Sequence, residues 1–151
     1  MLAVRFYDVA TAVHVMAVVV AFGWTFVTPA VGPWLRTSHP EALPAWHDAQ
    51  VRLSRMLVTP AMVVVLLVGI YLASDADVWD QAWVSIPLLI LLVLFGMLHG
   101  VVVPRERRLA NLSLDGPGRD YDALMRQTTL LESLQGVLVL VAILLMVAKP
   151  T

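Results

Sequence analysis

The sequence contains no cysteine among its 151 residues. Disulfides, iron–sulfur clusters and thiolate metal sites all need cysteine, so each of these is excluded. Charged side chains are also scarce, at 14% of the chain, and the formal net charge is -1. A nucleic-acid-binding protein carries an excess of basic residues, so the composition argues against a nucleic-acid partner.

Hydrophobic residues, in contrast, make up 60% of the chain, and the mean hydropathy is +0.82. Four apolar runs are long enough to cross a bilayer as helices, and the predicted spans are 9–31, 52–73, 83–103 and 122–148. The first run lacks a basic leader and a small-residue cleavage site, so we interpret it as a retained span. We therefore expect an all-α integral membrane four-helix bundle, a single domain over 1–151, with up-down-up-down topology.

Basic residues indicate how this bundle is oriented. They concentrate in and beside the first and third connections, at Arg36, Arg52, Arg55, Arg105, Arg107, Arg108, Arg119 and Arg126. Only Arg5 and Lys149 lie on the other side. The positive-inside rule then places both long connections in the cytoplasm and both termini outside, as in a multi-pass protein of the cell inner membrane. Aromatic anchors are expected near span ends, where the sequence has Trp24, Trp34, Trp79 and Trp83.

The two long connections are polar or rich in proline. Residues 32–48 contain three prolines and predict a loop with a short interfacial helix at residues 46–48. Residues 104–120 predict a basic loop with a turn at its centre. Because His39 and His47 lie in the first of these loops, we expect both to be solvated.

His14 is the one ionisable residue in the first predicted span. On a helix it shares a stripe with small residues, namely Ala10, Ala17, Ala21, Thr25 and Thr28. Small residues let another helix or a flat ligand approach closely, and an ionisable residue in a span usually faces protein or a cavity. Two interpretations follow for His14: a hydrogen bond to a neighbouring helix, or ligand or proton chemistry.

Four further polar side chains are candidates for binding a cofactor: Arg52, Arg55, His99 and Glu132. Glu132 is about 15 Å along its helix, so its carboxylate needs a partner or a proton. Arg55 is the best-placed cation, and we expect the two to interact directly or through a ligand's carboxylates and water. The alternatives are that both arginines only snorkel to headgroups, and that Glu132 only clamps helices together.

The two intramembrane histidines lie at different expected depths. His14 is near the outer end of its span and His99 is near the inner end of a parallel span, a difference of about 15 Å at 1.5 Å per residue. Two axial ligands of one haem iron should lie at nearly the same depth. The spacing therefore favours one histidine per site, or His14 with a non-histidine or open sixth position, over bis-histidine ligation of one iron.

Several short motifs occur along the chain in a consistent order. His14 is followed by Gly23 and Pro29, Arg55 leads into a Thr-Pro-Ala-Met segment at 59–62, the third span ends in His99-Gly100, and the chain finishes with Lys149-Pro150. In this order and spacing the chain resembles the HemJ-type protoporphyrinogen IX oxidase family and related four-helix bacterial membrane proteins. The resemblance implies a four-helix bundle, a b-type haem held through His14, and porphyrinogen or quinone-linked redox chemistry.

The chain also departs from the pattern of that family. Leu88 stands where the family has a lysine, Gln50 stands where it has a glutamate, and Glu132-Ser133 only approximates its Asn-Glu-x-Pro segment. The resemblance therefore supports the fold more than the oxidase activity. It is equally compatible with a haem-binding relative that has another task.

Three functions remain open from the sequence. The first is a haem-binding redox protein, in which Arg52 or Arg55 pairs with propionates because guanidinium groups bind carboxylates bidentately. The second is a metal-handling or small-solute membrane protein, although methionine–histidine pairs suited to soft copper are few. The third is a structural subunit without a cofactor. Lipid is the expected surrounding, and homo-oligomerisation stays open.

Overall fold

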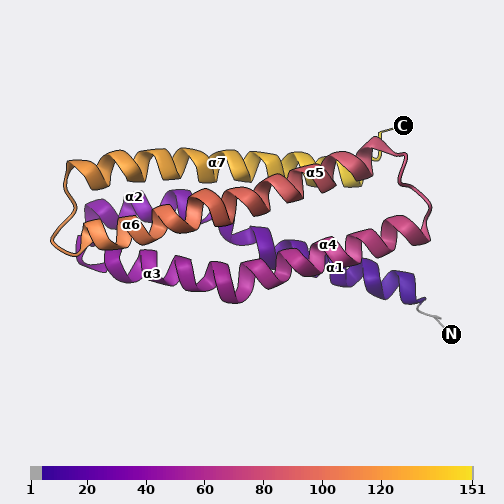
Figure 1. Ribbon diagram of the computed structural model, residues 1–151, viewed down its shortest axis with the longest axis horizontal. Coiled ribbons are helices and arrows are strands. Elements are labelled where there is room, and N and C mark those ends of the chain that lie inside the picture. The colour runs from indigo at the N-terminus through magenta and orange to yellow at the C-terminus, as the bar shows by residue number, and fades with distance from the viewer. Residues whose placement is uncertain (1–4, 151) are drawn as a thin grey trace.

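The computed structural model describes residues 5–150, and within this range all of its regular elements are helices, with no strand. Four rods are long and apolar enough to cross a membrane, and they span Phe6–Ser38, Pro40–Asp75, Ala82–Ser113 and Arg119–Ala148. Consecutive rods run antiparallel, so both ends of the described chain lie at the same end of the bundle (Figure 1). The predicted all-α bundle with up-down-up-down order is confirmed.

Three of the four rods are built from several helical segments. The first contains α1 (Phe6–Phe22), the 3-10 turn η1 (Gly23–Phe26) and α2 (Thr28–Ser38). The second contains the 3-10 turn η2 (Pro40–Ala42), α3 (Leu43–Leu53), the π-helical turn η3 (Ser54–Val58) and α4 (Thr59–Asp75). The third contains α5 (Ala82–Met97), the π-helical turn η4 (Leu98–Val102) and α6 (Val103–Ser113). The fourth is the unbroken helix α7 (Arg119–Ala148).

Both long connections that the sequence predicted as loops are largely helical. The first rod continues to Ser38 and α3 begins at Leu43, while residues 103–113 form α6. The loop prediction was wrong because most of the prolines in these segments occupy first helical turns, where no backbone N–H is needed. Rods of about 30 residues or more are at least about 45 Å long, so they extend beyond a hydrocarbon core of about 30 Å.

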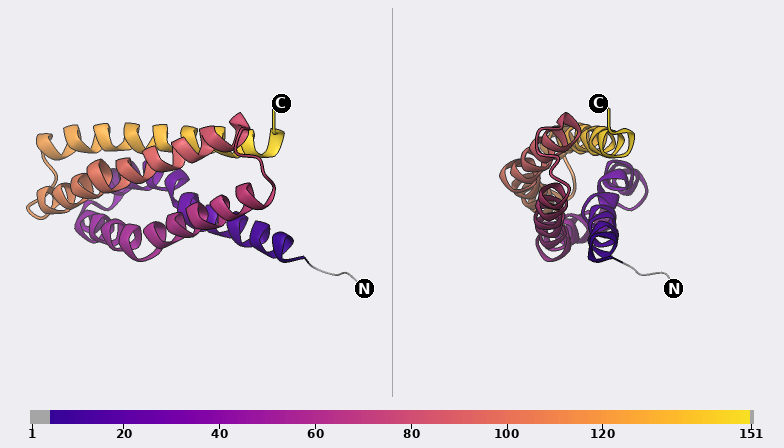
Figure 2. Two further views of the ribbon diagram at one scale, coloured as in Figure 1. Left: turned by 45° about the vertical axis from the view of Figure 1, so that its right-hand side comes forward. Right: turned by 90° about the vertical axis from the view of Figure 1, so that its right-hand side faces the viewer.

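We call the end with the two termini the terminal end and the opposite end, which carries the turns after α2 and α6, the basic end. At the terminal end α1 packs against α4 and α5 packs against α7, whereas at the basic end α3 packs against α6 and α2 against α7. Towards the terminal end, α1 diverges from α7 (Figure 2). The outward faces carry exposed apolar side chains such as Met56 and Val147, as expected for contact with lipid.

Each break in a rod is followed by a proline at the second residue of the next helix: Pro29 in α2, Pro60 in α4 and Pro104 in α6. Proline lacks the N–H that would bond to the carbonyl four residues earlier, and its ring clashes with that carbonyl. In all three rods this earlier residue lies within the 3-10 or π-helical turn. The breaks therefore accommodate the prolines, and α7, which contains no proline, stays regular.

Candidate functional site

A cavity with His14 in its wall lies between α1, α4, α5 and α7. We call it the His14 cavity. It encloses about 650 Å³ of atom-free space, its open mouth included. Except for His14 and Trp79, the residues that line it are aliphatic or aromatic hydrocarbon, proline or glycine, and they include Val18, Phe22, Val65, Gly69, Pro87, Leu88, Leu91, Val139 and Met146. His14 is its only ionisable lining group within residues 5–150.

The imidazole of His14 is held closely on one side. A Cβ placed on Gly69 would lie 3.1 Å from His14 Cε1, so glycine is what allows α4 to approach the ring. The main-chain carbonyl of Val65 also approaches the ring. His14 Nδ1 is enclosed and has no hydrogen-bond partner among the described residues. Nε2 is not enclosed in this way, so it is the nitrogen that remains accessible to a ligand.

The other predicted site residues lie away from this cavity. Arg52 is exposed and pairs with Asp48, at 3.1 Å between Nε and Oδ2. Arg55 is exposed on η3. His99 is exposed, and its Nε2 lies 3.1 Å from the Thr59 hydroxyl. Together with Glu132, these residues are absent from the described lining of the His14 cavity.

The axial separation of the two histidines agrees with the sequence expectation. His14 contacts α4 at Gly69, and His99 meets it at Thr59, ten positions earlier. At 1.5 Å per residue this is about 15 Å along one helix. The two histidines therefore do not face a common metal position.

Glu132 lines a separate, polar cavity close to the level of the three breaks, which we call the Glu132 cavity. It encloses about 360 Å³ of atom-free space. Its polar wall consists of Thr25, Thr28, Gln50, Ser54, Glu132 and Gln135, with the Trp24 ring beside them. The ring of Trp24 packs against that of Trp46, with 5.4 Å between centroids, so it faces the interior and is not the lipid anchor that the sequence predicted. Trp34 and Trp79 are exposed, as expected for anchors.

The expected direct contact between Arg55 and Glu132 is not formed. Glu132 is 6% exposed and lies inside the bundle, while Arg55 is exposed on its outer surface. The ion pairs of residues 5–150 do not include Glu132. Arg55 lies in the π-helical turn η3, whose register departs from that of a regular α-helix, and it therefore does not face Glu132 as regular helical spacing predicted.

A third cavity, lined by both apolar and polar side chains, connects the two levels. It shares Phe22, Leu94 and Val139 with the His14 cavity. It shares Thr25, Val58 and Gln135, among others, with the Glu132 cavity. The three cavities therefore form a column along the bundle interior, apolar towards the terminal end and polar towards the basic end.

Sequence reasoning missed a buried polar cluster next to the Glu132 cavity. His47, predicted to be solvated, is fully buried, and its Nδ1 lies 2.6 Å from Glu106 Oε2 and its Nε2 2.8 Å from the Tyr121 hydroxyl. The amide of Gln50 donates to the same Glu106 oxygen at 2.9 Å. The buried positions on α6, which are Val103, Glu106, Leu109 and Ser113, have helical spacing, and this periodicity was the signal that could have placed Glu106 inside.

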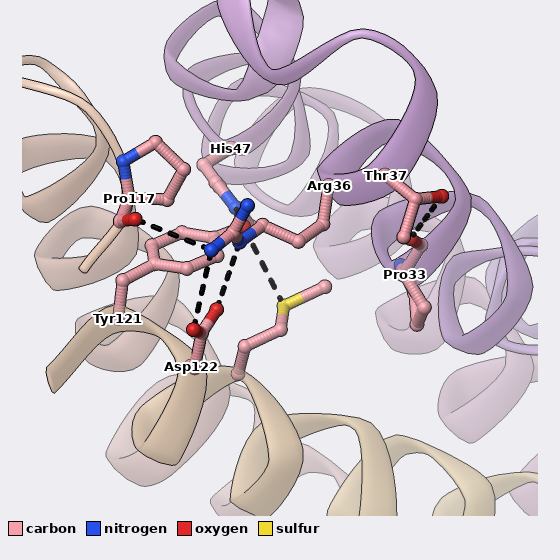
Figure 3. Close-up of polar contacts among 8 residues, drawn as sticks. Pro33, Arg36, Thr37, His47, Pro117, Tyr121 and Asp122 are labelled. Carbon is pink, nitrogen blue, oxygen red and sulfur yellow. Dashed lines mark hydrogen bonds and ion pairs between the residues drawn. The ribbon is translucent and has the colours of Figure 1, made fainter. Parts of the chain in front are cut away.

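The basic end is closed by a bidentate ion pair beside this cluster. Arg36 on α2 donates to both carboxylate oxygens of Asp122 on α7, at 2.8 and 3.2 Å, and to the carbonyl of Pro117 at 3.3 Å (Figure 3). The hydroxyl of Tyr121, the residue before Asp122, lies 2.8 Å from His47 Nε2 and 3.8 Å from the sulfur of Met125 (Figure 3). The first and last rods are thus joined where α7 begins.

Comparison with known proteins agrees with this architecture at the level of the family. No curated protein matches the chain. No solved structure matches it either. A protein family described as predicted integral membrane protein (DUF2269) matches residues 8–150, nearly the whole chain. Four membrane-length helices and a family match of this extent lead to one conclusion: the chain is an integral membrane protein that belongs to the DUF2269 family.

Proposed function

We propose that the His14 cavity binds a b-type haem, with His14 as its protein ligand, and that the protein acts in membrane redox or porphyrin chemistry. The observation that carries the proposal is a single partly buried imidazole, with Nδ1 enclosed, in the wall of an apolar cavity. A neutral imidazole nitrogen is a common iron ligand, and an apolar cavity suits a flat macrocycle.

The cavity meets several requirements of such a group. Its wall is almost entirely apolar, as in most sites that bind a flat organic cofactor. Contact with Gly69 and Val65 fixes the ring and leaves Nε2 accessible. A bound haem would supply one-electron chemistry, while the chain provides the ligand and excludes water.

The carboxylates of a haem would need a different partner from the one that the sequence suggested. Arg52 and Arg55 are exposed elsewhere on the surface. At the terminal end of the bundle, the Lys149 ammonium lies 5.1 Å from the centre of the Trp83 ring and follows Met146, which lines the cavity, by three residues. Lys149 is therefore the cation that we assign to this role.

Leu88 bears on the choice between haem binding and oxidation of protoporphyrinogen. It lines the His14 cavity at the position where the HemJ-type family, which the chain resembles, has a lysine. Without that cation, the cavity wall has one fewer partner for the carboxylates of a porphyrinogen substrate. We therefore propose haem binding with a redox activity in general, and oxidation of protoporphyrinogen only as one specific form of that activity.

The test is the absorption spectrum of protein purified after expression with ample haem. Wild-type protein should show a Soret band, and His14→Ala should lose or strongly shift it. His99→Ala is the matched control and should keep the band, because His99 lies outside the cavity. Loss of the band in His99→Ala but not in His14→Ala would show that His99, and not His14, is the haem ligand.

A wild-type protein without haem would overturn the proposal and separate the alternatives. Bound metal without haem would favour a metal-handling protein. A quinone extracted from the purified protein would assign the same cavity to a different flat redox molecule. A protein that contains none of these would be a structural membrane subunit.

A further inference from the structure

The Glu132 cavity contains a buried carboxyl group to which the proposed haem site gives no role. Glu132 is 6% exposed, and within the described range it has no arginine, lysine or histidine as an ion-pair partner. It lines a cavity together with other uncharged polar side chains, among them Thr28, Gln50 and Gln135. A charged carboxylate without a cation is costly in such a place, whereas a protonated one is tolerated.

Three of the four rods depart from regular α-helix geometry beside Glu132. The 3-10 turn η1 and the π-helical turns η3 and η4 each contribute residues to the wall of the cavity, through Thr25, Val58 and Leu98. Single π-helical turns within α-helices occur frequently at functional sites. The prolines that follow account for these turns, and the turns place Thr25, Val58 and Leu98 around one buried carboxyl group.

The charged groups around Glu132 are few. The wall residues from η1, α2, α3, η3 and η4 include no titratable group among the residues described. Glu106 on α6, which is 3% exposed and is hydrogen-bonded to His47 and Gln50, is the carboxyl group that lies behind this wall. Gln50 belongs both to this cluster and to the cavity wall. It therefore connects the His47–Glu106 pair to the space around Glu132.

We propose that Glu132 is a proton-binding site inside the bundle, and that it exchanges its proton with the basic end through the Glu132 cavity and the Glu106–His47 pair, which Gln50 holds against the cavity wall. In the exchange, the carboxylate of Glu132 takes up one proton to form a neutral carboxyl group and later releases it to water in the cavity. No electron moves, and the O–H bond is the only bond of Glu132 that forms or breaks. Water in the cavity carries the proton between Glu132 and the carboxylate of Glu106.

Infrared spectroscopy of the protein in lipid nanodiscs tests whether Glu132 holds the proton. The carbonyl band of a protonated carboxyl group should be present in wild-type protein, shift to lower frequency in D₂O, and disappear in Glu132→Gln. Glu106→Gln should keep the band, because it removes a different carboxyl group and leaves Glu132 in place. A band that persists in Glu132→Gln would overturn the proposal.

Sodium provides the second arm of the experiment. Replacing choline chloride with sodium chloride at constant pH should leave the band unchanged. If sodium weakens the band of wild-type protein and, equally, that of the exposed control Glu41→Gln, which keeps Glu132, then sodium displaces the proton from Glu132. The cavity would then be a site for a metal cation, and the proton assignment would be wrong.

The route of exchange is tested by the rate at which the band shifts after transfer into D₂O. Gln50→Met keeps the side-chain length but removes the amide, so it should slow the shift severalfold. Gln127→Met, at an exposed position on α7, is the matched control and should leave the rate unchanged. If Gln50→Met does not fold, Thr28→Val, on the opposite wall, replaces it with the same expectation. An unchanged rate in the folded variant would overturn the route.

Discussion

His47 Nδ1 lies 2.6 Å from the carboxylate of Glu106, 59 positions later in the sequence, and neither side chain is appreciably exposed. Since an ionised carboxylate only accepts hydrogen bonds, the imidazole donates to it from Nδ1. The pair joins α3 to α6, and the Tyr121 hydroxyl at Nε2 adds α7. One buried imidazole thus connects three of the four rods at the basic end.

The first prediction concerns the energetic coupling within this pair. Glu106→Leu or His47→Phe alone should lower the free energy of unfolding by about 3 kcal/mol, because each leaves a buried polar partner unsatisfied. The double variant should cost much less than the sum of the two. The measurement is a double-mutant cycle on denaturant unfolding in detergent.

The pair Arg36–Asp122 serves as the comparison for that cycle. Its side chains are 35% and 45% exposed, so its coupling should be about 1 kcal/mol at most and should decrease with added salt. Additive single effects for His47 and Glu106, or a coupling no larger than that of Arg36–Asp122, would contradict the importance of the buried pair.

The second prediction concerns Arg55 and Glu132, which the sequence suggested as partners. Arg55 is exposed and Glu132 lies inside the bundle, so the effects of Arg55→Leu and Glu132→Leu on unfolding should add within about 0.5 kcal/mol. The same detergent assay measures this cycle. A coupling well above that value would show that a ligand or water connects the two, as the sequence alone had suggested.

The sequence predicted the architecture well because its strongest signals, long apolar runs and basic connections, are those that the bilayer imposes. It also indicated the different depths of His14 and His99 through residue counting alone. The prediction of loops at residues 32–48 and 104–120 missed the burial of His47 and Glu106. Prolines and charges normally mark loops, whereas here Pro44 and Pro104 lie in the first turns of helices. The missing contact of Glu132 with Arg55 has a related cause, since a π-helical turn cannot be read from helical periodicity.

The third prediction tests how closely α4 holds the imidazole in the His14 cavity. A methyl group on Gly69 would lie 3.1 Å from His14 Cε1, so Gly69→Ala should push the ring by a few tenths of an ångström and lower the free energy of unfolding. In a His14→Ala background the same change should be neutral or stabilising, because alanine favours a helix by up to about 1 kcal/mol over glycine. If haem is bound, Gly69→Ala should also shift its absorption spectrum.

Gly96→Ala is the matched control for this experiment. It lies within α5, and no atom would come within 4 Å of the added Cβ. It should therefore stabilise the protein slightly in both backgrounds and leave any haem spectrum unchanged. Equal effects of Gly69→Ala with and without the His14 imidazole would show that the ring is free to move away.

The last prediction concerns the sidedness of the bundle. The basic end carries Arg36, Arg105, Arg107, Arg108 and Arg119, whereas the short connection between α4 and α5 at the opposite end carries two aspartates and no basic residue. The positive-inside rule therefore places the turn at residues 114–118 in the cytoplasm and the connection at residues 76–81 outside. A reporter that is active only in the cytoplasm should work when inserted in the first segment and fail in the second. The reverse pattern would invert the bundle, and Glu132 would then exchange protons with the outside through the basic end.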